Sequence, residues 1–115
     1  MKKINIIKKS NDFTRIIKAK KGISNNLFIL NQEANELNIP KFGITFVKKI
    51  GNAVTRNKLK RQVKSIIDNN KDIYEKNKNY IIIIRKDATR ATYKELETNL
   101  VNLFLKLKGD KNEKK

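Results

Sequence analysis

Cysteine and histidine are both missing from this 115-residue chain. Without cysteine the protein has neither disulfides nor thiolate metal sites, which suits a reducing cytoplasm. Without histidine it lacks the commonest metal ligand and the usual general base at neutral pH. These two absences disfavour catalysis by the chain itself and leave binding as the expected activity.

Acidic residues are scarce, with 11 Asp and Glu against 28 Lys and Arg, so the net charge is +17. The carboxylates are scattered, without the clustered spacing of a two-metal nuclease, and no glycine-rich phosphate loop is present. We therefore predict no catalytic residue and no metal ligand in this chain. A merely solvated basic surface is the plainer interpretation, but so high a charge favours a nucleic-acid partner.

Long apolar runs are also missing. No segment approaches the ~18 apolar residues of a membrane-spanning helix, and the N-terminus lacks the apolar core of a signal peptide. We expect a cytoplasmic protein that does not act at a membrane. The length fits one domain, residues 1–109, followed by a polar and charged tail, residues 110–115, that we expect to be disordered.

The segment 48–64 carries seven cations in seventeen residues and still keeps an apolar stripe. Helical spacing predicts a helix that begins after Asn52, ends near 69–70 and buries Leu59, Val63, Ile66 and Ile67. Arg56, Lys60 and Lys64 recur at i, i+4 and i+8 on another face. Like charges at this spacing repel one another, and a polyanion would relieve that repulsion.

The remaining elements surround this basic helix. A first helix is predicted from the cap at Ser10 to Gly22, and a last helix from the capping box Thr92-x-x-Glu95 to a stop at Gly109. Helical spacing gives the last helix an apolar stripe of Tyr93, Leu96, Leu100, Leu103, Phe104 and Leu107. Strands are predicted at 27–30, 42–47 and 80–84, with a loop over 31–40. Alternation puts Phe42, Ile44 and Phe46 on the core face, and Gly43, Thr45 and Val47 on the other. The pattern predicts a single-domain α+β sandwich with two or three strands before the basic helix.

The motif Lys49-x-Gly51-Asn52-Ala53-Val54-x-Arg56-Asn57-x-x-Lys60-Arg61 resembles the Arg-Asn-x-x-Lys-Arg signature of the protein subunit of bacterial ribonuclease P. The resemblance covers nearly the whole chain, including Lys8-Lys9-x-x-Asp12-Phe13 and the run 80–85. It implies the element order αβββαβα and a mixed sheet with a left-handed crossover around the basic helix. Topology rules alone would predict the right-handed form.

The resemblance also implies a function. Family members bind a large catalytic RNA which, with Mg²⁺ held mainly by that RNA, removes the 5′ leader from precursor tRNA. The chain would thus be a subunit of an RNA-dependent endoribonuclease, a monomer with one copy per RNA, and not itself the catalyst. The residues expected to contact the catalytic RNA are Lys48, Lys49, Asn52, Arg56, Asn57, Lys60, Arg61 and Lys64.

A cleft between the first helix and one sheet face is implied to hold the single-stranded leader. Its expected residues are Phe13, Ile17, Asn31, Thr45, Val47, Arg85 and Lys86. Phe13 suits stacking on an unpaired base, although without the resemblance it would be interpreted as helix core. Family members often carry aromatics where this chain has Ile17 and Asn31, so we expect weaker stacking here.

A basic ribosomal or nucleoid protein that binds RNA or DNA as a structural component is the alternative. It would use the same charge without any substrate turnover. Cleavage of precursor tRNA in the presence of the catalytic RNA and magnesium would discriminate between the two functions.

Overall fold

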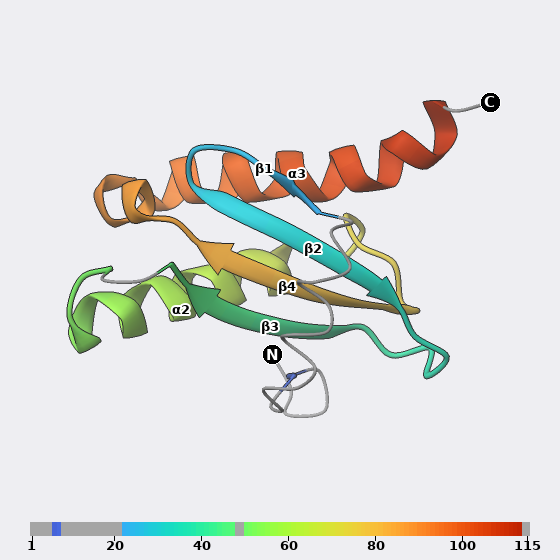
Figure 1. The fold of residues 1–115 in the computed structure, drawn as a ribbon, viewed down its shortest axis with the longest axis horizontal. Coiled ribbons are helices and arrows are strands. Elements are labelled where there is room, and N and C mark those ends of the chain that lie inside the picture. The colour runs from blue at the N-terminus through green and yellow to red at the C-terminus, as the bar shows by residue number, and fades with distance from the viewer. Residues whose placement is uncertain (1–5, 8–21, 48–49, 114–115) are drawn as a thin grey trace.

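The computed structural model describes residues 6–7, 22–47 and 50–113. The predicted first helix lies outside these residues, apart from its expected stop at Gly22. The described elements, labelled in Figure 1, are β1 (Ile23–Ser24), β2 (Phe28–Ala34), β3 (Lys41–Phe46), α2 (Ala53–Asn69), β4 (Lys78–Ile84), the 3-10 helix η2 (Lys86–Arg90) and α3 (Tyr93–Glu113).

The strands form one four-stranded sheet in the order β1-β2-β4-β3. β4 pairs antiparallel with β2 and parallel with β3. The mixed sheet is therefore confirmed, and three strands precede α2, as the resemblance implies. The short β1 and the helix η2 were not predicted individually from the sequence.

A parallel pair of neighbouring strands needs a crossover connection, and here α2 is that connection. In Figure 1, β3 runs to the left, α2 returns behind the sheet, and β4 again runs to the left above β3. The crossover is therefore left-handed, against the strong general preference for the right-handed form.

The two long helices cover one face of the sheet, which makes a two-layer α+β sandwich (Figure 1). Alternate residues of the central strand β4 point to opposite faces. Tyr80, Ile82 and Ile84 join the main core beneath the helices, whereas Ile81 lies on the other face with Ile7 and Ile83. β4 is thus apolar on both faces, which explains its uninterrupted run of isoleucines. We call the face without α2 and α3 the open face.

The helix predictions from apolar spacing are confirmed in the core. The buried residues of α2 are Leu59, Val63, Ile66 and Ile67. On α3 the buried stripe is Leu96, Leu100, Leu103, Phe104 and Leu107. The capping box is also formed, because the Thr92 N–H donates to Glu95 Oε1 at 2.8 Å and the Glu95 N–H donates to Thr92 Oγ1 at 3.2 Å.

An aromatic cluster closes the core at the end of the sheet where β4 begins. Phe42 stacks on Tyr80 with ring centroids 5.6 Å apart, and Phe104 meets Tyr80 edge-on at 5.0 Å. The Tyr80 hydroxyl accepts a hydrogen bond from the Glu75 N–H at 2.9 Å. Burial raises the pKa of Tyr80 to about 12, so the ring stays neutral at physiological pH.

Two predicted boundaries are wrong. The predicted loop from Asn31 begins only after Ala34, because residues 31–34 pair with β4 and this pairing outweighs their polar composition. The last helix does not stop at Gly109 but continues to Glu113. A single glycine costs a helix only ~1 kcal/mol relative to alanine, too little to end this one. Residues 110–113 therefore form the last part of α3.

The central strand offers a direct test of the packing. Ile82 is fully buried, so Ile82→Ala should lower the free energy of unfolding in urea by about 2–5 kcal/mol. Leu37, which is 56% exposed, is the matched control, and Leu37→Ala should change it by less than ~0.5 kcal/mol. Equal losses in the two variants would contradict the core assignment.

Candidate nucleic-acid interface

The turn into α2 is fixed by two residues of the basic motif. Gly51 has a φ of +54°, and a Cβ there would lie 3.0 Å from Thr55 Cβ. Only glycine adopts this left-handed conformation without strain. Asn52 caps the helix by accepting the Thr55 N–H on its Oδ1 at 2.9 Å. The first turn of α2 therefore starts at a defined place beside the end of β3.

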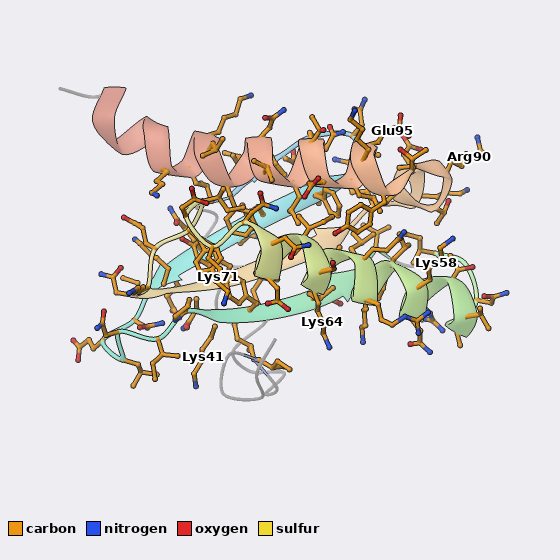
Figure 2. All side chains as sticks on the ribbon, turned by 180° about the vertical axis from the view of Figure 1, so that it is seen from behind. Lys41, Lys58, Lys64, Lys71, Arg90 and Glu95 are labelled. Carbon is orange, nitrogen blue, oxygen red and sulfur yellow. The ribbon has the colours of Figure 1, made fainter. Side chains whose placement is uncertain are left out.

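The cations of α2 lie on the surface of the helix. Arg56, Lys58, Lys60 and Arg61 are exposed, and Lys64 is half-buried. Figure 2, which views the molecule from the helix side, shows Lys64 on the side of α2 that borders β3. We call this side the β3 flank. Arg56 and Lys60 precede Lys64 at spacings of eight and four residues and share this flank, as predicted.

The opposite side of α2 faces α3. Its position is marked by Ser65, whose hydroxyl hydrogen-bonds that of Tyr93 on α3 at 2.9 Å. Lys58, seven residues earlier, lies on the same side, which we call the α3 flank (Figure 2). Arg61 and Asn57 are exposed on the crest between the two flanks. Lys58 was not among the residues expected to contact RNA.

The positive charge of α2 is not neutralised within the described part of the protein. Among residues 6–7, 22–47 and 50–113, the ion pair within 4.0 Å joins Lys78 to Glu75 at 3.9 Å, away from α2. The α2 cations therefore remain available to an external polyanion.

Asn52, Lys48 and Lys49 are also expected to contact RNA. The Oδ1 of Asn52 already accepts a hydrogen bond as the helix cap, so the group of this side chain that is left for RNA is the Nδ2 donor. Lys48 and Lys49 lie outside the described residues.

The open face is a second surface with a different character. Its floor comes from alternate residues of three strands, among them Ile29, Asn31, Thr45, Ile81 and Ile83. Ile7 lies against this face, since its N–H donates to the Phe42 carbonyl at 2.9 Å and its side chain packs with Ile81. This face is apolar at its centre, with Asn31 only 5% exposed.

The structure brings only some of the predicted cleft residues to this face. Asn31 pairs with Ile81, and Thr45 pairs with Ile83, so both belong to it. Val47 was placed there wrongly, because its side chain packs against the main core. β3 ends at Phe46, and strand alternation no longer applies to Val47 beyond it. Phe13 and Ile17 lie outside the described residues.

The other two predicted cleft residues follow the end of β4. Arg85 and Lys86 are both exposed. Arg85 Nη1 donates to the Asn25 carbonyl at 3.3 Å, so its guanidinium leans towards the turn between β1 and β2. Lys86 opens η2. They lie at the end of the sheet next to the start of α2, and their part in a cleft stays a prediction.

Sequence analysis missed a polar groove of about 450 Å³, built from the β1–β2 turn, η2 and the start of α3. Asn25 holds its walls together, with Nδ2 donating to the Asn99 carbonyl at 3.1 Å and Oδ1 accepting the Phe28 N–H at 2.9 Å. Arg90 and Glu95, both labelled in Figure 2, are among the residues that line it. The lining residues are Asn26, Leu27, Asp87, Arg90, Ala91, Glu95 and Asn99.

Two absences among the described residues bear on function. Within the residues that the structure describes, Asp and Glu side chains do not gather in groups of three or more that could hold a metal ion. Among the described helices, none combines the length and apolar character needed to cross a membrane.

Comparison with known proteins gives consistent matches. The family model described as Ribonuclease P matches residues 1–108. The ribonuclease P protein component of Mycoplasma mycoides is 40% identical over 109 residues, covering 94% of this chain and all of the relative. The solved Staphylococcus aureus RNase P protein superposes with a TM-score of 0.79 at 33% identity, covering 86% of this chain and 91% of that one. The Thermotoga maritima RNase P protein gives 0.79 at 30%, covering 87% and 94%.

The side chain of Asn52 caps α2 and is also expected to contact RNA, and two substitutions can separate these roles. Asn52→Ala should lower the free energy of unfolding by about 1 kcal/mol, because the Thr55 N–H loses its acceptor. Asn52→Asp keeps the acceptor and should stay within ~0.5 kcal/mol of the parent protein. It should nevertheless weaken RNA binding, since it replaces the Nδ2 donor with a negative charge. Urea unfolding and RNA titration measure the two effects, and unchanged RNA binding in Asn52→Asp would contradict the contact.

Proposed function

The chain belongs to the ribonuclease P protein family, and we propose that it serves this ribonucleoprotein through two surfaces, α2 for the catalytic RNA and the open face for the 5′ leader of precursor tRNA. Its relatives are protein components of ribonuclease P, an endoribonuclease, so the chain is a subunit of that enzyme. The alternative of a ribosomal or nucleoid protein is not favoured by these relatives.

The observation that carries this proposal is the set of α2 cations, which have no ion-pair partner among the described residues; four of them are exposed and Lys64 is half-buried. Arginine forks grip phosphates with two hydrogen bonds, and lysines add charge without a fixed geometry. The rigid turn at Gly51 and Asn52 and the buried stripe of α2 hold the helix on the sheet. The cations are thereby presented on a fixed scaffold, and little order has to be created when the RNA binds.

The open face suits an unpaired strand better than a duplex. Ile29 and Ile83 are half-buried apolar residues of this face, and Thr45 adds a half-buried polar side chain, whereas Ile81 and Asn31 are buried. Single-stranded RNA exposes base faces and edges that such a mixed surface can contact. In this proposal Phe13 and Ile17 overhang this face, and Arg85 and Lys86 meet the leader backbone at its end.

The division of labour leaves the chemistry to the RNA. The chain lacks His and Cys, and its described acidic side chains do not assemble a metal site. We propose that Mg²⁺ is held mainly by the RNA and supplies the charge stabilisation that cleavage requires. The protein's residues bind and orient the two RNAs. One protein copy per catalytic RNA, acting in the cytoplasm, completes the proposal.

Reconstitution tests the proposed function directly. Protein, the catalytic RNA, precursor tRNA and magnesium together should yield the 5′ cut, and protein without the catalytic RNA should yield none. The product ends are measured by primer extension. Magnesium-dependent cutting of the precursor by RNA-free protein, lost when one acidic residue is replaced, would overturn the assignment of catalysis to the RNA.

Charge removal on α2 should weaken assembly with the catalytic RNA. The double variant with Arg56→Ala and Arg61→Ala loses two exposed cations. The slope of log K against log[salt] for RNA binding should therefore become shallower by about 1.4–1.8. Circular dichroism should show an unchanged fold. Unchanged affinity and slope in the double variant would exclude α2 as the RNA surface.

The leader contact is tested by the ratio of precursor to mature tRNA affinity. Phe13→Ala should weaken precursor binding to the holoenzyme by about 1–3 kcal/mol, the contribution of one base–aromatic stack. Mature tRNA lacks the leader and should bind as before. If the ratio is kept and thermal stability falls instead, Phe13 belongs to the core and the cleft assignment fails.

A further inference from the structure

The cations of α2 point in nearly opposite directions. Successive helix residues are about 100° apart, so residues two positions apart are separated by about 160° measured the shorter way. Lys58 lies two positions from both Arg56 and Lys60. It therefore points away from both of them, and all three side chains are exposed. The charge of the helix is spread over two flanks and does not form one stripe.

The α3 flank carries a second cation from another element. Lys58 lies on this flank, and η2 packs against α2 beside it. Arg90, in the last turn of η2, is exposed. Figure 2 shows Arg90 and Lys58 at the same end of the molecule, with Lys64 on the far side of α2. Lys58 and Arg90 thus define a cationic edge separate from Arg56, Lys60 and Lys64.

One phosphate backbone cannot serve both edges. A helix with its side chains is about 10–12 Å across, whereas charge-assisted hydrogen bonds to phosphate are only about 2.7–2.9 Å long. The apolar stripe of α2 is packed on the sheet, so RNA cannot pass beneath the helix. We infer that α2 is held between two RNA backbones, one along Arg56, Lys60 and Lys64 and the other along Lys58 and Arg90.

The surroundings of the second edge fit this inference, which rests on the proposed function. Val54, four residues before Lys58, is 76% exposed and offers an apolar contact to a ribose or base on the same flank. The polar groove that Arg90 lines also presents Asp87 and Glu95. These carboxylates repel phosphate, so the second backbone runs between Lys58 and Arg90 and does not continue along the groove.

Directed cleavage of the RNA locates the two backbones. The chain has no cysteine, so Lys58→Cys and Lys64→Cys each give a single site for an iron chelate that generates hydroxyl radicals. In complexes with the catalytic RNA, the two probes should cut two separate sets of nucleotides. Identical sets, or cuts from position 64 alone, would overturn the two-backbone inference. Cuts from neither position would instead contradict α2 as the RNA surface.

Paired variants provide an independent measure. The double variant with Lys58→Gln and Arg90→Gln should make the slope of log K against log[salt] for RNA binding shallower by about 1.4–1.8. The double variant with Arg56→Gln and Lys60→Gln should have the same effect. In the fourfold variant the two changes in slope should add. The matched control, Lys76→Gln with Lys106→Gln, removes two exposed cations elsewhere and should leave the slope nearly unchanged. A slope as steep as the parent's in Lys58→Gln with Arg90→Gln would refute the second edge.

Discussion

The parallel pairing of β3 with β4 is the constraint on which the rest of the structure depends. Parallel neighbours need a crossover, and that crossover is α2, the helix that carries the basic motif. β4 also separates β2 from β3, so its isoleucines must be buried on both faces. One pairing therefore fixes the basic helix on one side of the sheet and leaves an apolar open face on the other.

The two surfaces divide recognition according to their chemistry. On α2, charge dominates, and the apolar stripe beneath it anchors the helix to the main core. On the open face, Ile83 is half-buried and Ile81 is fully buried. A structured RNA offers mainly phosphates to a helix, whereas an unpaired leader offers bases to a sheet. In the proposed function, the catalytic RNA and the leader therefore bind different faces of one small protein.

Much of this architecture could be predicted from the sequence. Apolar spacing identified the buried residues of α2 and α3, and the signals at Asn52 and Thr92 placed their first turns correctly. Local pattern failed where tertiary pairing decides the outcome. Residues 31–34 look like a loop until β4 pairs with them, and Val47 follows strand alternation only until β3 ends. The left-handed crossover could not be predicted from the sequence pattern either, since only the family resemblance implied it.

The helical spacing of the α2 cations was predictable from the sequence, but the arrangement of neighbouring elements around them was not. The repeat of Arg56, Lys60 and Lys64 indicated one flank, while Lys58 and Arg90 lie at the same end of the molecule because η2 packs against α2. Lysine acetylation of the free and RNA-bound protein, read by mass spectrometry, tests the central claim most directly. The account predicts that Lys58, Lys60 and Lys64 are protected by the RNA while Lys76 and Lys106 stay reactive. Protection of Lys76 and Lys106, with the α2 lysines still reactive, would contradict it.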